Sequence, residues 1–311
     1  MLLLGFAYPG ALLDGRTYRL LGFIHQPSQA VWSNVQPDLL IGTAWKRPEL
    51  VTYSVRKKAT EVVAVFPNYA EIDFGGGEGN LSFDDRRIAL FGRTGYDWDL
   101  FVYDLQLKRV LGRLALHSEK VGGTSPVDNA TMSPTGKYVV LGFRERGNGA
   151  RQGVVLLDEQ LNYLRHLSSR GGSHFDICLS EGQEYWVGTD DFSSSLVSVS
   201  LADARKRTIV SSIDLSYNIH ISCRDTVGEG RVYISEYFAH GDRKVADDRR
   251  LGIAKLQSEN VRWITSTRSS ESTEYRRNPM VVADRSGHRL LWASDWGKPD
   301  GLVFTYVLEL H

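Results

Sequence analysis

The stretch Gly171–Tyr237 contains two successive copies of one pattern: GGSHFDICLSEGQEYWVGTDD begins at Gly171 and YNIHISCRDTVGEGRVYISEY begins at Tyr217. In each copy a histidine opens a short alternating strand, a polar turn follows, and a strand rich in aromatic and β-branched residues returns. The two openers, His174 and His220, lie 46 residues apart. This spacing is about the length of one four-stranded propeller blade. The stretch therefore predicts two neighbouring blades with their histidines at equivalent positions.

Related strand–turn–strand segments occur elsewhere in the chain. Asn80 opens one within residues 75–116, Asn129 opens DNATMSPTGKYVVLGF, and Asn278 opens NPMVVADRSGHRLLWASDW. One or two weaker copies fit between Gly22 and Phe66, where LVTYSV and EVVAVF flank a basic turn, as in a β-hairpin. Helical periodicity is scarce.

The regular spacing predicts an all-β fold, a single β-propeller domain over residues 1–311. Dividing the length by the period gives between six and seven repeats, and we expect seven four-stranded blades. A pair of β-sandwiches is the alternative, but it would not require such regular spacing.

Charge and hydropathy exclude several classes of partner. Lys+Arg and Asp+Glu number 37 each, so no global field attracts nucleic acid or an acidic membrane. No apolar run approaches the roughly 18 residues of a membrane span. We expect a monomer without a nucleic-acid partner and without membrane insertion.

Only two cysteines occur, Cys178 and Cys223, at related places in neighbouring repeats. Two cysteines do not make a disulfide framework. We therefore expect both to be small buried apolar residues on inner strands, which makes them a weak guide to compartment.

The residues that open the innermost strands are the first candidates for a site, because they face one mouth of a propeller channel. None of them is apolar; they are Asn80, Asn129, His174, His220 and Asn278. Five polar openers favour a polar ligand near the axis. Propellers also fix their blades with buried polar hydrogen bonds, so a structural role stays open for each residue.

Other polar residues lie close to these openers in sequence. Asp176 shares a strand face with His174 and would either orient an imidazole or bond to backbone. Arg224 and the loop residue Arg144 offer the planar fork that binds carboxylates, unless they are solvated. Tyr237 ends a return strand. His220 and Cys223 would lie on opposite strand faces, which argues against a metal site built from them.

The segments SHFD at His174, HISCRD with the following VYISEY at His220, and PMVVADRSGHRLLWASDW carry a family resemblance. They resemble the propeller family of oligogalacturonate lyases and, more loosely, the propeller ulvan lyases. The resemblance implies β-elimination of an acidic polysaccharide or oligosaccharide containing uronate, by a secreted or periplasmic protein.

The chemistry of that reaction assigns roles to the candidates. The resemblance implies His174 or His220 as the base for the C5 proton, Arg224 as the group that neutralises the substrate carboxylate, and Tyr237 as the acid. The remaining candidates would bind substrate; they are Asn80, Asn129, Arg144, Asn278 and Asp176.

Three questions stay open from the sequence. The family places several histidines around a divalent metal ion, but Asn278 stands where a further histidine would, so the metal is undecided. A non-catalytic propeller that binds a glycan or a protein is the alternative function. Hydrolysis by paired carboxylates would require Asp176 and Glu236.

Overall fold

The computed structural model describes residues 2–4, 10–24, 27–75, 79–116, 127–145, 147, 151–169, 174–190, 195–211, 218–227, 230–237, 249–270, 277–298 and 300–310. The chain divides into two compact units, Met1–His166 and Leu167–His311, with the boundary inside one strand. The regular elements of the described residues are β-strands, as the sequence predicts. No helix in these ranges is long and apolar enough to cross a membrane.

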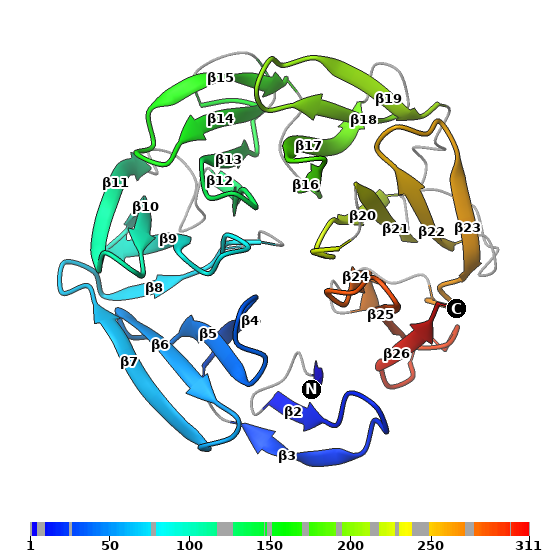
Figure 1. The fold of residues 1–311 in the computed structure, drawn as a ribbon, viewed down its shortest axis with the longest axis horizontal. Coiled ribbons are helices and arrows are strands. Elements are labelled where there is room, and N and C mark those ends of the chain that lie inside the picture. The colour runs from blue at the N-terminus through cyan, green and yellow to red at the C-terminus, as the bar shows by residue number, and fades with distance from the viewer. Residues whose placement is uncertain are drawn as a thin grey trace. The chain divides into compact units, whose positions relative to one another are not determined.

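The first unit consists of antiparallel sheets in which strands adjacent in sequence are neighbours (Figure 1). The first sheet has three strands, β1 (Leu2–Leu4), β2 (Gly10–Leu13) and β3 (Leu20–Ile24). The second has β4 (Gln29–Trp32), β5 (Leu39–Thr43), β6 (Glu49–Ser54) and β7 (Ala59–Val65). The third has β8 (Glu71–Asp73), β9 (Arg87–Thr94), β10 (Asp97–Asp104) and β11 (Arg109–Leu116). The fourth has β12 (Val127–Met132), β13 (Tyr138–Phe143), β14 (Val154–Asp158) and β15 (Tyr163–Ser168).

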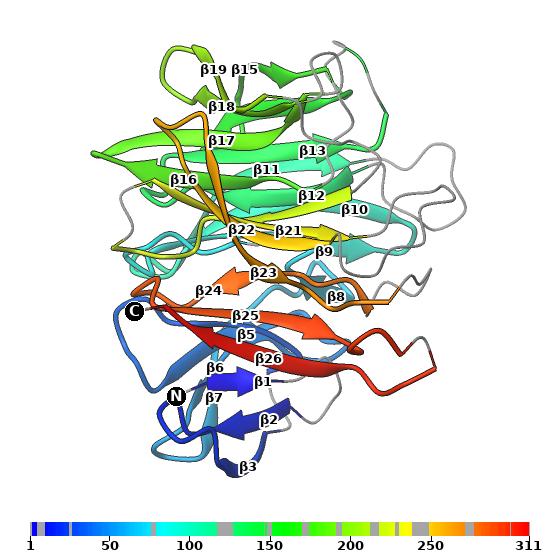
Figure 2. The same cartoon turned by 90° about the vertical axis from the view of Figure 1, so that its right-hand side faces the viewer.

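The second unit continues the same pattern. One sheet has β16 (Asp176–Ser180), β17 (Gln183–Asp190), β18 (Ser195–Ser200) and β19 (Lys206–Val210). The next has β20 (Asn218–Ser222), β21 (Arg231–Tyr237), β22 (Arg250–Lys255) and β23 (Val261–Ser266). The last has three strands, β24 (Val282–Ala283), β25 (Arg289–Ser294) and β26 (Phe304–Glu309), drawn in orange and red in Figure 2.

A recurring β-bulge supports the equivalence of the sheets. In the third-to-fourth strand pair the register shifts at Leu50/Val51, Val102/Tyr103, Leu196/Val197 and Leu251/Gly252. A bulge increases the local twist of a strand pair, so the outer strands of these blades turn in the same way. The predicted hairpin around the basic turn is also confirmed, as the pair β6–β7.

The predicted count of seven four-stranded blades was wrong. From β4 to β26 there are six blades, five with four strands and the last with three; the three-stranded sheet β1–β3 precedes them. The division by period overcounted for two reasons. The segment Gly22–Phe66 contains one blade, β4–β7, and the 58 residues from His220 to Asn278 also contain one.

Apolar layers between neighbouring sheets hold each unit together. In the first unit Leu100, Ala130 and Leu141 are fully buried in the layer between β8–β11 and β12–β15. In the second unit Val187 and Leu196 lie in the corresponding layer against β20–β23. Burial of each aliphatic side chain contributes about 1.5–3 kcal/mol, so these layers stabilise the packing of neighbouring blades.

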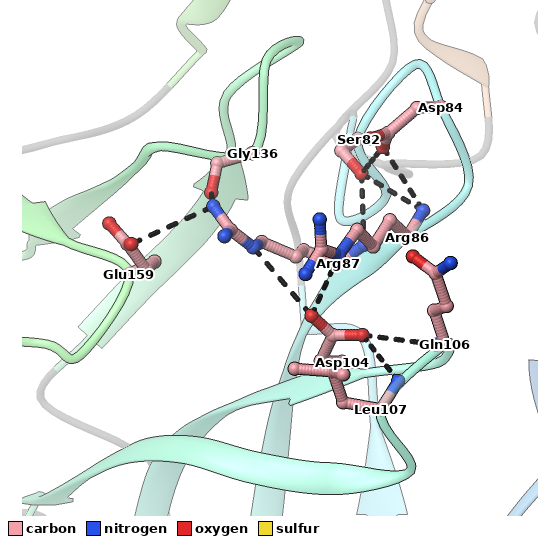
Figure 3. Close-up of polar contacts among 9 residues, drawn as sticks. All are labelled: Ser82, Asp84, Arg86, Arg87, Asp104, Gln106, Leu107, Gly136 and Glu159. Atoms are coloured by element: carbon pink, nitrogen blue, oxygen red, sulfur yellow. Dashed lines mark hydrogen bonds and ion pairs between the residues drawn. The ribbon is translucent and has the colours of Figure 1, made fainter.

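Buried ion pairs supplement the apolar layers, as Figure 3 shows for the first unit. Asp104 is fully buried and accepts hydrogen bonds from the Leu107 amide at 2.8 Å and from Arg86 Nε at 2.9 Å. Burial alone would raise the pKa of Asp104, but these hydrogen bonds outweigh it and hold the pKa below its usual value. Arg87 donates to the Gly136 carbonyl at 2.8 Å and so links two blades.

Candidate functional site

The second unit brings the two predicted histidines together. His174 lies just before β16 with φ of 51°, in the left-handed region that non-glycine residues seldom adopt. His220 lies in β20 and pairs with Ser235 of β21. Their ring centroids are 5.7 Å apart with the planes inclined at 59°. The two rings approach each other, but His174 precedes its strand whereas His220 is the third residue of β20, so equivalent positions and a shared functional site stay a prediction.

The two imidazoles differ in their exposure. His220 is buried, with 5% of its surface exposed, whereas His174 is half-buried. The arrangement provides an accessible imidazole with a second one behind it, which suits proton transfer.

Arg224 and Asp176, both predicted to contact substrate, form an ion pair with each other. Arg224 Nε donates to Asp176 Oδ2 at 3.1 Å, and Arg224 Nη2 makes a second, shorter contact with Oδ1. Asp176 is fully buried and also accepts from the Cys223 and Ile177 amides, each at 2.8 Å. Asp176 is therefore a structural anchor rather than a substrate ligand. Arg224 uses Nε and Nη2 for this carboxylate, and its predicted role as a substrate ligand stays a prediction.

The carboxylates required for hydrolysis are occupied in the same way. Glu236 is buried and accepts hydrogen bonds from Arg250 Nε at 3.0 Å and Nη2 at 2.9 Å. The Arg250 guanidinium also lies over the Trp263 ring, 3.9 Å from its centroid. Asp176 and Glu236 are thus each neutralised by an arginine, and the paired-carboxylate hypothesis loses both of its acids.

Asn80 has a structural role in the first unit rather than the predicted role in binding. Its carboxamide is buried and donates to the carbonyls of Phe74 at 2.7 Å, Ala89 at 3.3 Å and Ala130 at 3.2 Å. Because Ala130 belongs to the next blade, Asn80 fastens two inner strands together.

The other candidates are placed but not assigned a function. Asn129 is buried in β12, and its Oδ1 has no hydrogen-bond partner among the described residues. Arg144 is exposed after β13, and Asn278 is half-buried before β24. Tyr237 ends β21, and its side chain lies outside the described residues.

The sequence analysis missed the covalent link between the blades that carry the histidines. Cys178 and Cys223 form a disulfide, with 1% and 3% of their surfaces exposed. They are buried on or next to inner strands, as predicted, but they are not free thiols. The sequence did contain a signal for this disulfide: the two cysteines lie at related places in neighbouring repeats, and the inner strands of neighbouring blades lie side by side.

Two buried polar clusters in the second unit were also missed. Tyr233 donates to Asp225 in a short contact, and Arg231 Nε lies 3.1 Å from the same carboxylate. Burial raises the pKa of the Tyr233 hydroxyl, and the bond to Asp225 raises it further, so this tyrosine stays protonated. Asp295 binds Arg277 at 3.1 Å and the Ser270 amide at 2.7 Å. The first cluster lies within the blade β20–β23, and the second joins the end of that blade to the last one.

The described residues do not fit a metal ion. The two histidines would supply two ligands, whereas protein metal sites use at least three protein ligands for catalytic zinc and more oxygen ligands for harder ions. In the described ranges no group of three or more His, Cys, Asp or Glu side chains is close enough to hold a metal ion. Asp176 is bonded to Arg224, and both cysteines are oxidised. We therefore derive no step through a metal.

Comparisons with known proteins identify the fold. No protein-family model and no curated protein matches the chain. A solved oligogalacturonate lyase in complex with manganese has a TM-score of 0.66 at 13% identity, covering 97% of this chain and 83% of that one. An oligogalacturonate lyase from Vibrio parahaemolyticus has a TM-score of 0.65 at 10% identity, with coverage of 97% and 83%.

A propeller of a different protein class is also similar. The β-propeller domain of the Trilobed protease from Pyrococcus furiosus has a TM-score of 0.57 at 10% identity, covering 97% of this chain and 86% of that one. Identities this low establish the fold alone. The chain is an all-β β-propeller with four-stranded blades.

Proposed function

We propose that this protein is a carbohydrate-active propeller, a lyase that cleaves a uronate-containing polysaccharide or oligosaccharide by β-elimination. The observation that carries the proposal is the approach of His174 and His220 to 5.7 Å between ring centroids, one just before β16 and the other within β20. The likeness of the fold to two oligogalacturonate lyases supports it.

The histidine pair suits the proton transfer that the reaction requires. A base removes the proton at C5 of the uronate, the C–H electron pair forms the C4–C5 double bond, and the bond from C4 to the leaving oxygen breaks. An acid then protonates that oxygen. His174 is the proposed base because it is the more exposed of the two imidazoles, and His220 lies behind it to share the proton. Tyr237, at the end of β21, remains the proposed acid.

The partner and the compartment follow from the same proposal. The ligand is an acidic glycan, bound by a monomer in a secreted or periplasmic setting. The disulfide between Cys178 and Cys223 supports that setting, because such bonds persist mainly in oxidising compartments.

The direct test is a panel of pectic, ulvan, alginate and glycosaminoglycan substrates, with the ultraviolet absorbance of new unsaturated uronate ends as the readout. Each reaction is run with manganese, with calcium and with a chelator, so that a metal requirement becomes visible. We expect absorbance to rise on at least one substrate. No rise on any member of the panel would overturn the proposal.

Matched variants locate the reaction. His174→Gln and His220→Gln should each lower kcat by about 100-fold or more, the usual contribution of a general acid or base. His288→Gln is the control, because His288 is exposed in the turn before β25. Full activity in both site variants would remove the histidine pair from the reaction.

A non-catalytic propeller that binds a glycan or protein is the second candidate. It is favoured by the structural use of Asp176, Arg224 and Asn80, which leaves fewer predicted residues for chemistry. Saturable binding of an acidic glycan without any turnover in the same panel would select this function over the lyase.

A further inference from the structure

A polar cavity of about 180 Å³ lies in the second unit, away from the histidines. Its lining comes from β16–β19 and from the residues after β22, and includes Ser180, Tyr185, Ser198, Arg205, Arg207 and Gln257. Because β16 runs from Asp176 to Ser180, the cavity lies at the opposite end of that strand from His174. It is therefore separate from the proposed active site.

The strand register places the polar lining on one face of a sheet. Ser198 of β18 is directly opposite Arg207 of β19, and Tyr185 of β17 is opposite Cys178 of β16. Ser180 lies two residues after Cys178 and so shares its face. This is the face whose apolar residues pack on β20–β23, the neighbouring sheet in Figure 1. The layer between the two blades is apolar in its middle and polar at this end.

Two buried hydroxyl groups point to a ligand at this place. Ser180 is 6% exposed and Ser198 is 2% exposed, and both line the cavity. Neither hydroxyl has a hydrogen-bond partner among the residues that the structure describes. Neither hydroxyl is among the enclosed polar atoms of the described residues that lack a partner, so both open into the cavity, where a ligand can bond to them.

The charge of the lining selects an anion. Arg207 forms no ion pair with any residue in the described ranges. Arg205 is 3.9 Å from Asp203, but both side chains are exposed, and such a pair is weak. The cavity also exceeds the roughly 30 Å³ of one water molecule several times, so it has room for a multi-atom group.

We propose that this cavity binds an oxyanion, a sulfate, phosphate or carboxylate group held by Arg207, Arg205 and the hydroxyls of Ser180 and Ser198. Guanidinium groups bind such anions through two parallel hydrogen bonds, and serine hydroxyls add further donors. The site does not depend on the proposed lyase reaction, because it shares no residue with the histidine pair.

The test is isothermal titration of the full chain with sodium sulfate and with sodium phosphate, at an ionic strength held constant with sodium chloride. We expect saturable binding of at least one anion. Arg207→Gln should weaken it about tenfold, in line with the loss of a charge-assisted hydrogen bond, and Ser198→Ala should weaken it less. Arg262→Gln is the matched control, because Arg262 is exposed on β23 of the neighbouring blade and should leave binding unchanged.

Further titrations identify the source of the anion. The same titration is repeated with glucuronate and with a sulfated monosaccharide. If these bind more tightly than the free ions, the site takes an anionic group carried on a glycan; if they bind more weakly, it takes a free ion. Signals that do not saturate, or that are equal in wild type and Arg207→Gln, would overturn the proposal.

Discussion

Arg224 and Asp176 join the same two strands that carry the histidine pair. Asp176 follows His174 by two residues in one blade, and Arg224 follows His220 by four in the next. The disulfide between Cys178 and Cys223 links these strands a second time. The strands next to the two imidazoles are therefore held together by a part-buried ion pair and a buried covalent bond.

Removal of either partner of the ion pair should destabilise the protein. Arg224→Ala leaves the fully buried Asp176 carboxylate without its guanidinium, and loss of one member of a buried pair costs about 3–5 kcal/mol. Because Arg224 keeps some solvent contact, we expect the free energy of unfolding of the variant, measured with denaturant, to fall by about 2–4 kcal/mol. Arg262→Ala, an exposed arginine on β23, is the control and should change the unfolding free energy by less than about 0.5 kcal/mol. Unchanged stability with lost turnover would instead make Arg224 a substrate ligand.

The disulfide gives a second prediction that is independent of activity. Closing a loop with a sequence separation of 45 residues stabilises a protein by about 2–4 kcal/mol, so Cys178→Ser and Cys223→Ser should each lower the unfolding free energy by that amount. The chemical check is a thiol titration in denaturant without reductant, in which wild type should show no free thiol and each variant one. Two reactive thiols in wild type would contradict the bond.

The extent to which sequence predicted these features depends on how local each feature is. A blade is a run of strands joined by short turns, so the copies opened by Asn80, Asn129, His174, His220 and Asn278 were visible from spacing alone. Equivalence between repeats also predicted that His174 and His220 would meet. The bond of Arg224 to Asp176 was not predictable in this way, since the partners are 48 residues apart and no pattern specifies which carboxylate an arginine contacts. The blade count failed where loop lengths varied.

Asn80 and Asn129 are both buried asparagines in the inner parts of neighbouring blades, yet substitution should affect them unequally. Asn80→Ala removes a carboxamide that donates to the carbonyls of Phe74, Ala89 and Ala130. Leaving buried acceptors unsatisfied costs about 1–3 kcal/mol. Asn129→Ala is the matched comparison, because its Oδ1 has no partner among the described residues, and its cost should be smaller. Denaturant unfolding of the two variants decides the matter; equal costs would contradict a structural role specific to Asn80.

Asp73 predicts a pH dependence of stability in the first unit. Burial raises the pKa of this β8 carboxyl to about 6 from 3.8, with Glu71 adding to the effect and the Gly75 amide opposing it. A raised pKa means that the folded protein binds the proton more tightly than the unfolded chain. The stabilisation is therefore complete below about pH 4 and is lost as the pH rises through about 6. Asp73 is only part-buried, so we discount the pKa shift and expect the free energy of unfolding to fall by about 1–2 kcal/mol, less than the whole shift would correspond to.

Asp73→Asn isolates this contribution, because the amide cannot titrate. The difference in unfolding free energy between wild type and Asp73→Asn should change across pH 4–6.5 by about 1–2 kcal/mol, with wild type losing ground as the pH rises. Taking this difference cancels the pH-dependent contributions of the groups that both proteins share. Asp104 is one of them: its pKa is lowered, so the stability that it contributes is lost only as the pH falls. A difference for Asp73→Asn that is flat, or that has the opposite slope, would show that the carboxyl titrates as it does in the unfolded chain.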